Sequence, residues 1–198
     1  MQKPGEPSRV MFLYWGRRGA LSRFTLELGR VALNQPDLRT TITVSRQNES
    51  FDNFREFGDA LFPITTFASN VGALIQSWRV PLLRRSLVAR LQRDRIQAVV
   101  ALMPHVWTPL VAPAIRRAGV RYATIIHDAD GHPGDPTSVV HGWQLRDVLH
   151  ADVVLTLSLA VAGRLEATGR VPRDKLFPLF HPDITYGPPA NPCPPGPG

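Results

Sequence analysis

Short apolar runs and longer stretches with helical spacing take turns along the chain. Residues 9–15 form a continuous apolar run behind a Pro/Gly-rich entry, which is typical of a strand buried on both faces. Residues 39–45 are β-branched and alternate in polarity, so they predict a second strand. Between them, residues 21–33 have the spacing of an amphipathic helix. We expect that helix to gather its apolar residues on one side, namely Phe24, Leu28 and Val31.

The same alternation continues to residue 180. Further strands are predicted at residues 61–67, 98–103, 120–126, 152–157 and 176–180. Further helices are predicted at residues 71–95, 108–118, 138–150 and 159–168. Pro63 indicates an edge position for its strand, and Pro81 predicts a kink or a break in the first of these helices. The pattern predicts an α/β protein with a Rossmann-like open, mostly parallel sheet and helices on both faces.

Composition limits the class of protein. Hydrophobic residues make up 43% and charged residues 20%, which is a globular profile and excludes global disorder. Apolar stretches such as residues 98–103 are far shorter than the roughly 18 residues of a membrane-spanning helix. Residues 1–7 lack the apolar segment of a secretory signal, and Cys193 is the single cysteine. We therefore expect a cytoplasmic protein.

The chain is basic, and its positive charge comes almost entirely from arginine. The formal net charge is +7, and Lys3 and Lys175 are the only lysines. A basic surface concentrates anionic partners such as nucleotides and phospholipids. Nucleic acid is not an expected partner, because the arginines are dispersed and no aromatic RNA-binding motif or zinc-finger spacing occurs.

Residues 78–95 place leucines and arginines at helical spacing. Leu83, Leu87 and Leu91 form one stripe, and arginines occupy other faces. One interpretation is a helix that covers the sheet and turns a solvated basic face outward. The alternative is a peripheral contact with anionic lipid at the inner face of the membrane, with Trp78 and Leu82 inserted.

Polar residues follow several predicted strands, at the sheet edge where ligands of open parallel sheets bind. The richest segment is residues 127–135, with two histidines and three aspartates. Imidazole and carboxylate suit zinc or manganese, so a metal-dependent hydrolase is one alternative. Gly131, Pro133 and Gly134 also fit a simple turn. We favour a polar active-site or substrate loop.

A glycine turn follows the first strand. Gly16 and Gly19 stand between a strand and a helix N-terminus, where backbone N–H groups can bind phosphate. The G-x-x-G spacing is weak by itself, because neither G-x-G-x-x-G nor a P-loop is present. Arg17 and Arg18 favour an anion at this turn.

Several stretches together resemble the family 4 glycosyltransferases, enzymes with the two-domain GT-B architecture. Residues 13–28 (LYWGRRGALSRFTLEL) are similar to the family's first strand, glycine loop and first helix. Residues 123–128 (ATIIHD) resemble its strand that ends in a histidine. Residues 151–158 (ADVVLTLS), with 161–165 and 172–176, resemble its last strand–helix–strand unit.

The resemblance implies transfer of a sugar from a nucleotide-diphosphate sugar, with retention of configuration, to a glycan, lipid or small-molecule acceptor. It implies His127 at the reaction centre, with Asp128 to orient it, and Gly16, Gly19 and Ala20 near the donor phosphates. Ala20 stands where the family usually has a second glycine. The expected acceptor-side and cleft-lining residues are Arg17, Arg18, His105, Asp130, His132, Asp135 and Ser158. No metal and no further cofactor are expected.

The resemblance also implies a missing half. We expect residues 1–187 to be the N-terminal, acceptor-binding domain, and the Pro/Gly-rich residues 188–198 to be a linker. The family's second domain carries a Glu-x7-Glu pattern and most of the donor site. Without it, we expect the isolated chain to transfer no sugar at a useful rate. A non-catalytic acceptor- or lipid-binding module is the alternative outside enzymes.

Overall fold

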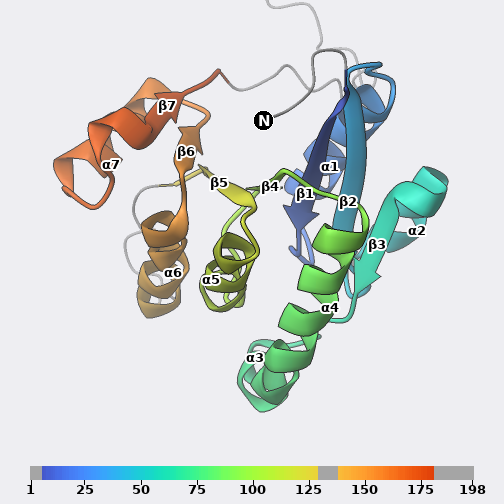
Figure 1. Ribbon diagram of the computed structural model, residues 1–198. Helices are drawn as coiled ribbons and strands as arrows, with labels where there is room; N and C mark the ends of the chain where they lie inside the picture. Colours follow the sequence, from blue (N-terminus) through green and yellow to red (C-terminus); the bar gives the residue numbers. More distant parts are fainter. Residues whose placement is uncertain (1–5, 129–137, 181–198) are drawn as a thin grey trace, which may run out of the picture.

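Seven parallel strands form one sheet in the order β3-β2-β1-β4-β5-β6-β7 (Figure 1). The computed structural model describes residues 6–128 and 138–180. The strands are β1 (Ser8–Tyr14), β2 (Leu38–Ser45), β3 (Leu61–Ile64), β4 (Ala98–Ala101), β5 (Arg121–Ile126), β6 (Val153–Thr156) and β7 (Leu176–Pro178). The chain order reverses between β1 and β4, which is where open parallel sheets bind their ligands.

The longer helices lie where the apolar periodicity predicts them, whereas the short helices of residues 51–60 were not predicted. The α-helices are α1 (Leu21–Leu33), α2 (Phe51–Phe54), α3 (Asn70–Ile75), α4 (Val80–Arg93), α5 (Thr108–Arg117), α6 (Ser138–Gln144) and α7 (Leu159–Ala167). Short 3-10 helices are η1 (Arg55–Ala60), η2 (Gln76–Arg79), η3 (Leu145–His150) and η4 (Arg173–Lys175). The predicted break near Pro81 is confirmed, because α4 begins with Pro81 in its first turn, where its missing N–H costs nothing.

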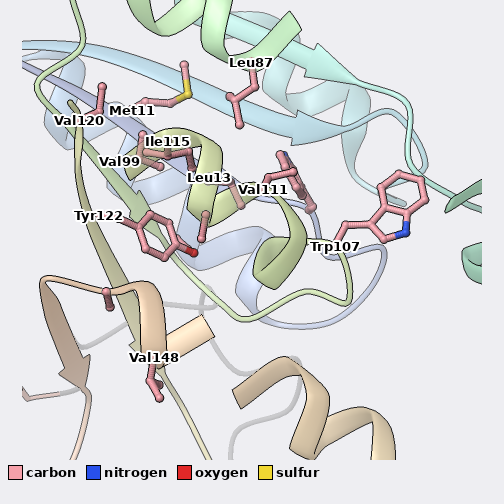
Figure 2. Packing of buried hydrophobic residues seen from close by; sticks show 14 of the residues in the cluster. Met11, Leu13, Leu87, Val99, Trp107, Val111, Ile115, Val120, Tyr122 and Val148 are labelled. Atoms are coloured by element: carbon pink, nitrogen blue, oxygen red, sulfur yellow. The ribbon is translucent and has the colours of Figure 1, made fainter. Parts of the chain in front are cut away.

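Strand β1 is buried on both faces, as its continuous apolar run predicts. Met11 and Leu13 belong to one core cluster, together with Leu87 of α4 and Ile115 of α5. Figure 2 shows side chains of α5 packed against those of β1 and β4 in this cluster. Tyr14, on the alternate face, belongs to a second cluster. Helices on both faces around a parallel sheet make this an α/β Rossmann-like domain, which confirms the predicted fold class.

Helix α1 has the predicted bounds but not the predicted buried face. Val31 is 58% exposed, so its placement on the buried side is wrong. Phe24 is buried as predicted, and Leu26, Gly29 and Ala32 are buried with it. A Cβ on Gly29 would lie 2.6 Å from the Phe57 ring and 2.8 Å from a methyl of Ile42. The helix therefore approaches the sheet so closely at Gly29 that a larger residue would not fit there.

Strand β3 lies at an edge of the sheet, as Pro63 predicts. Across residues 6–128 and 138–180, no helix has both the length and the apolar character to cross a bilayer.

Candidate functional site

A hollow of about 150 Å³ opens at the carboxyl edge of the sheet, beside the reversal of strand order. Leu21, at the start of α1, lines this hollow. His127 and Asp128, which directly follow β5, line it as well. Its remaining lining residues are Met103, Pro104, Gln144 and Leu145. The fold therefore brings the predicted reaction-centre histidine to the same hollow as a residue two positions after Gly19.

His127 is held in one orientation by the backbone after β4. Its Nε2 lies 2.8 Å from the carbonyl oxygen of Leu102. A carbonyl oxygen only accepts, so Nε2 carries the hydrogen and donates it. The ring is half-buried, whereas Asp128 is exposed at the rim. The imidazole is thus positioned by the backbone, with an exposed carboxylate beside it.

The glycine turn ahead of α1 already has an anionic partner. Gly19 has a φ of 103°, a left-handed conformation that favours glycine. Its backbone N–H donates to Oε1 of Glu49, at 3.0 Å. Ala20 is exposed and is the N-terminal flanking residue of α1. The carboxylate of Glu49 thus accepts the hydrogen bond that the Gly19 N–H would otherwise donate to a phosphate at this turn.

Gly16 has a packing role in the same turn. A Cβ on Gly16 would lie 2.7 Å from the hydroxyl oxygen of Tyr14, so any larger residue would collide with that ring. The close approach accounts for the glycine without a ligand.

A buried polar network beneath the turn fixes its position. The side-chain amide of Asn48 donates to the carbonyl oxygen of Gly16 at 2.8 Å and to the hydroxyl of Ser22 at 3.0 Å. The hydroxyls of Ser22 and Tyr14 lie 3.1 Å apart. Burial raises the pKa of Tyr14, against the lowering effect of its hydrogen bonds to Ser22 and Asn48. Asn48 and Glu49 thus contact the turn, and neither was among the predicted site residues. The one sequence signal for them is their place shortly after the second strand.

The two arginines of the turn point to different surroundings. The guanidinium of Arg17 donates to the carbonyl oxygen of Ala68 and lies 5.4 Å from the centre of the Phe67 ring. Arg17 therefore bridges to the segment after β3, while Arg18 is exposed. Both remain at the predicted edge, and Arg18 is the more accessible to an acceptor.

His105 lies beneath the rim instead of lining it. It is 6% exposed and stacks on Phe67 at 5.1 Å, with the rings of Trp15 and Trp107 at 5.8 and 6.0 Å. Its Nδ1 accepts from the Trp107 backbone N–H at 3.2 Å, so Nε2 carries the hydrogen in the neutral ring. Burial, with a smaller contribution from the charge of Arg17, lowers the pKa of His105 to about 3. The enclosed ring of His105 directly follows Pro104 of the wall in sequence, but it does not itself line the hollow.

Ser158 caps a helix. Its hydroxyl accepts from the backbone N–H of Val161 at 3.2 Å, and Ser158 has the extended backbone of an N-cap residue. The structure thus gives Ser158 a local structural role at the carboxyl end of β6.

Asp130, His132 and Asp135 lie outside the described residues. Within residues 6–128 and 138–180, no group of three or more His, Cys, Asp or Glu side chains is arranged to hold a metal ion. The structure therefore does not test a metal site built from residues 127–135.

Comparison with solved structures finds the same fold in one half of larger enzymes. The UDP-GlcNAc 2-epimerase from Neisseria meningitidis bound to UDP-GlcNAc matches with a TM-score of 0.61 and 11% identity, over 87% of this chain and 45% of that chain. The UDP-N-acetylglucosamine 2-epimerase from Rickettsia bellii matches with a TM-score of 0.61 and 16% identity, over 87% and 44%. MurG from Acinetobacter baumannii matches with a TM-score of 0.55 and 15% identity, over 78% and 42%.

No family model matches the sequence, and no curated protein does. The chain spans less than half the length of the three structures compared above. At these identities the matches show the fold alone, and membership of family 4 stays a prediction. The chain has the fold of one half of GT-B nucleotide-sugar enzymes.

Proposed function

We propose that this chain supplies the acceptor-side half of an enzyme that transfers a sugar from a nucleotide-diphosphate sugar to an acceptor. The observation that carries the proposal is the hollow at the reversal of strand order, in a domain with the fold of one GT-B half. That hollow combines a backbone-anchored imidazole, His127, with the start of the helix that follows the glycine turn.

In the proposed reaction, the bond between the anomeric carbon and the diphosphate breaks, and a bond to an acceptor hydroxyl forms with retention of configuration. The diphosphate leaves with the electron pair, and its released oxygen takes the proton of the acceptor hydroxyl. His127 lies where it can contact the transferred sugar, because Leu102 fixes its ring at the hollow. Asp128, exposed beside it, can orient a sugar or acceptor hydroxyl.

The glycine turn contributes a backbone amide for the donor diphosphate. The Gly19 N–H donates to Glu49 in the ligand-free chain. A phosphate oxygen would have to take that hydrogen bond from the carboxylate, so Glu49 weakens anion binding until it moves aside. The exposed guanidinium of Arg18 supplies positive charge at the same turn.

The other half of the site, from the remainder of a longer protein or from a partner, would supply most donor contacts. A leaving diphosphate needs opposing positive groups and dipoles on both sides of the cleft. We therefore expect no useful rate of sugar transfer from this chain alone.

The test is a chemical-shift titration of the labelled chain with UDP and UDP-GlcNAc at millimolar concentrations. We expect the backbone amides of Gly19, Leu21 and Met103 to shift, and His127→Ala to abolish the shifts. His150→Ala is the matched control, since His150 does not line the hollow. Glu49→Gln removes the competing charge and should tighten binding. Shifts that are absent, or that persist in full in His127→Ala, would contradict the proposal.

A further inference from the structure

The helical segment of residues 70–93 carries apolar side chains on two opposite sides. It comprises α3, η2 and α4 in direct succession. One side packs on the sheet through Val80, Leu87 and Leu91, all buried. The other side holds Val71, Leu74, Ile75, Trp78 and Leu82, which are between 62% and 78% exposed. We call these five residues the outer stripe.

The outer stripe has helical spacing, because its other members follow Val71 by three, four, seven and eleven residues. A helix at the surface of a globular domain normally turns charged and polar residues outward. Exposed apolar side chains gathered on one surface mark an interaction site. Folding of the domain does not require the outer stripe, because the sheet is already covered by the opposite side of the segment.

The charge around the outer stripe has one sign. Residues 60–93 contain five arginines and no aspartate or glutamate. Arg79 lies over the Trp78 ring at 5.8 Å, and Arg85 is exposed one turn beyond Leu82. The last two arginines, Arg90 and Arg93, pair with Asp94 and are turned to that carboxylate. Positive charge therefore borders the apolar stripe and favours an anionic partner.

The first helix that carries the stripe projects from the sheet. Helix α3 stands beyond the ends toward which β1 and β3 point (Figure 1). Tryptophan and arginine beside leucine and isoleucine are the residues that amphipathic helices place at the boundary between headgroups and acyl chains. A projecting helix with this composition matches the surface of an anionic bilayer.

We propose that the outer stripe docks this protein on an anionic lipid bilayer, with the flanking arginines on the headgroups. The structure moves the docking region from residues 78–95, where the sequence places it, to residues 71–82, because Leu87 and Leu91 pack on the sheet. The indole N–H of Trp107 donates to the Ala73 carbonyl oxygen at 3.4 Å, which ties α3 to the segment that follows β4. The bilayer would thus lie next to the predicted acceptor edge.

The test is flotation of the full chain with vesicles of phosphatidylcholine alone or mixed with phosphatidylglycerol, without any nucleotide sugar. We expect binding to the mixed vesicles and little to the neutral ones. Leu74→Ser with Ile75→Ser should weaken binding by at least about tenfold, because two inserted side chains are removed. Arg79→Gln with Arg85→Gln should weaken binding to mixed vesicles by about thirtyfold, since each arginine close to an anionic surface strengthens binding by roughly fivefold.

The matched control is Val31→Ser with Leu33→Ser, a pair of exposed apolar residues on α1 outside the stripe. Its binding should equal that of the unchanged chain. Absence of vesicle binding, or equal loss in the control pair, would overturn the proposal. Light scattering that shows a dimer dissolved by the Leu74/Ile75 change, with no vesicle binding, would assign the stripe to a second copy instead. Vesicle binding does not depend on sugar chemistry, so either proposal can fail without the other.

Discussion

Two buried ionisable groups, His105 and Asp147, support different walls of the hollow at the carboxyl edge. His105 adjoins Pro104, and Asp147 lies in η3, which begins with Leu145. Each has one polar atom, Nε2 of His105 and Oδ1 of Asp147, that is buried without a hydrogen-bond partner in the described part of the chain. Their surroundings differ, because His105 sits among aromatic rings and Asp147 sits among hydroxyl groups.

Burial disfavours the charged form of both groups, and it therefore shifts their pKa values in opposite directions. It lowers the pKa of His105 to about 3 and raises the pKa of Asp147 to about 6. The Tyr122 hydroxyl donates to Asp147 at 2.6 Å and that of Thr124 at 3.2 Å. These hydrogen bonds favour the carboxylate but do not offset the loss of hydration. The hydrogen-bonding partners of Asp147 reduce its pKa shift, but the exclusion of water determines the direction of that shift.

The two shifts have opposite consequences for stability. The neutral His105 stabilises the fold above the ordinary histidine pKa of about 6.5, and that stability is lost as the pH falls toward 3. The protonated Asp147 stabilises the fold below its ordinary pKa of 3.8, and that stability is lost as the pH rises through about 6. Between pH 4 and 6 the two groups therefore oppose each other.

The largest effect should come from removal of the aromatic-enclosed ring. His105→Ala opens a cavity among Trp15, Phe67 and Trp107, and it should lower the free energy of unfolding by about 3 kcal/mol at pH 7.5. Urea unfolding measures the loss. His150→Ala, at a half-buried histidine, should cost less than about 0.5 kcal/mol. Equal costs in the two variants would show that the aromatic enclosure adds nothing.

Asp147→Asn separates the effects of His105 and Asp147 on the pH dependence of stability. This change removes the group that gains stability on acidification, so the acid sensitivity of His105 is no longer offset. Between pH 6 and pH 4, the free energy of unfolding should fall by about 2 kcal/mol more than in the unchanged chain. Urea midpoints at pH 4, 5 and 6 measure this difference. Asp174→Asn, at an exposed carboxylate, is the control and should leave the pH dependence of the free energy of unfolding unchanged. The same pH dependence in all three proteins would contradict the opposed effects of His105 and Asp147.

A smaller effect should follow loss of one hydrogen bond to the carboxylate. Tyr122→Phe removes the donor 2.6 Å from Asp147 and should cost about 1.5 kcal/mol at pH 7.5, where the carboxylate is charged. The cost should shrink at pH 4, where the carboxyl is protonated. Unfolding at the two pH values measures this change, and a cost independent of pH would mean that Asp147 does not titrate between them.

Apolar periodicity predicted the elements well, because strands buried on both faces and helices on a sheet leave strong patterns. It failed where packing depends on contacts remote in sequence. The buried side of α1 is set by the close approach at Gly29, so Val31 faces outward. The enclosure of His105 requires Phe67, which belongs to a segment after another strand. The position of a polar residue directly after a strand therefore predicted the carboxyl edge of the sheet correctly. It did not predict which of these side chains, such as His105, are buried beneath that edge.

The smallest effect sharpens the cause of the His105 shift. Arg17 lowers the pKa of His105 through its charge, but burial is the larger cause. Arg17→Gln should therefore raise the pKa of His105 while leaving it below the ordinary value, and the free energy of unfolding should change by less than about 0.5 kcal/mol at pH 7.5. An NMR pH titration of the His105 ring measures the shift, with Arg18→Gln, at an exposed arginine, as the control. A His105 that returns to its ordinary pKa in Arg17→Gln would make charge, not burial, the dominant cause, and the comparison with Asp147 would then no longer hold.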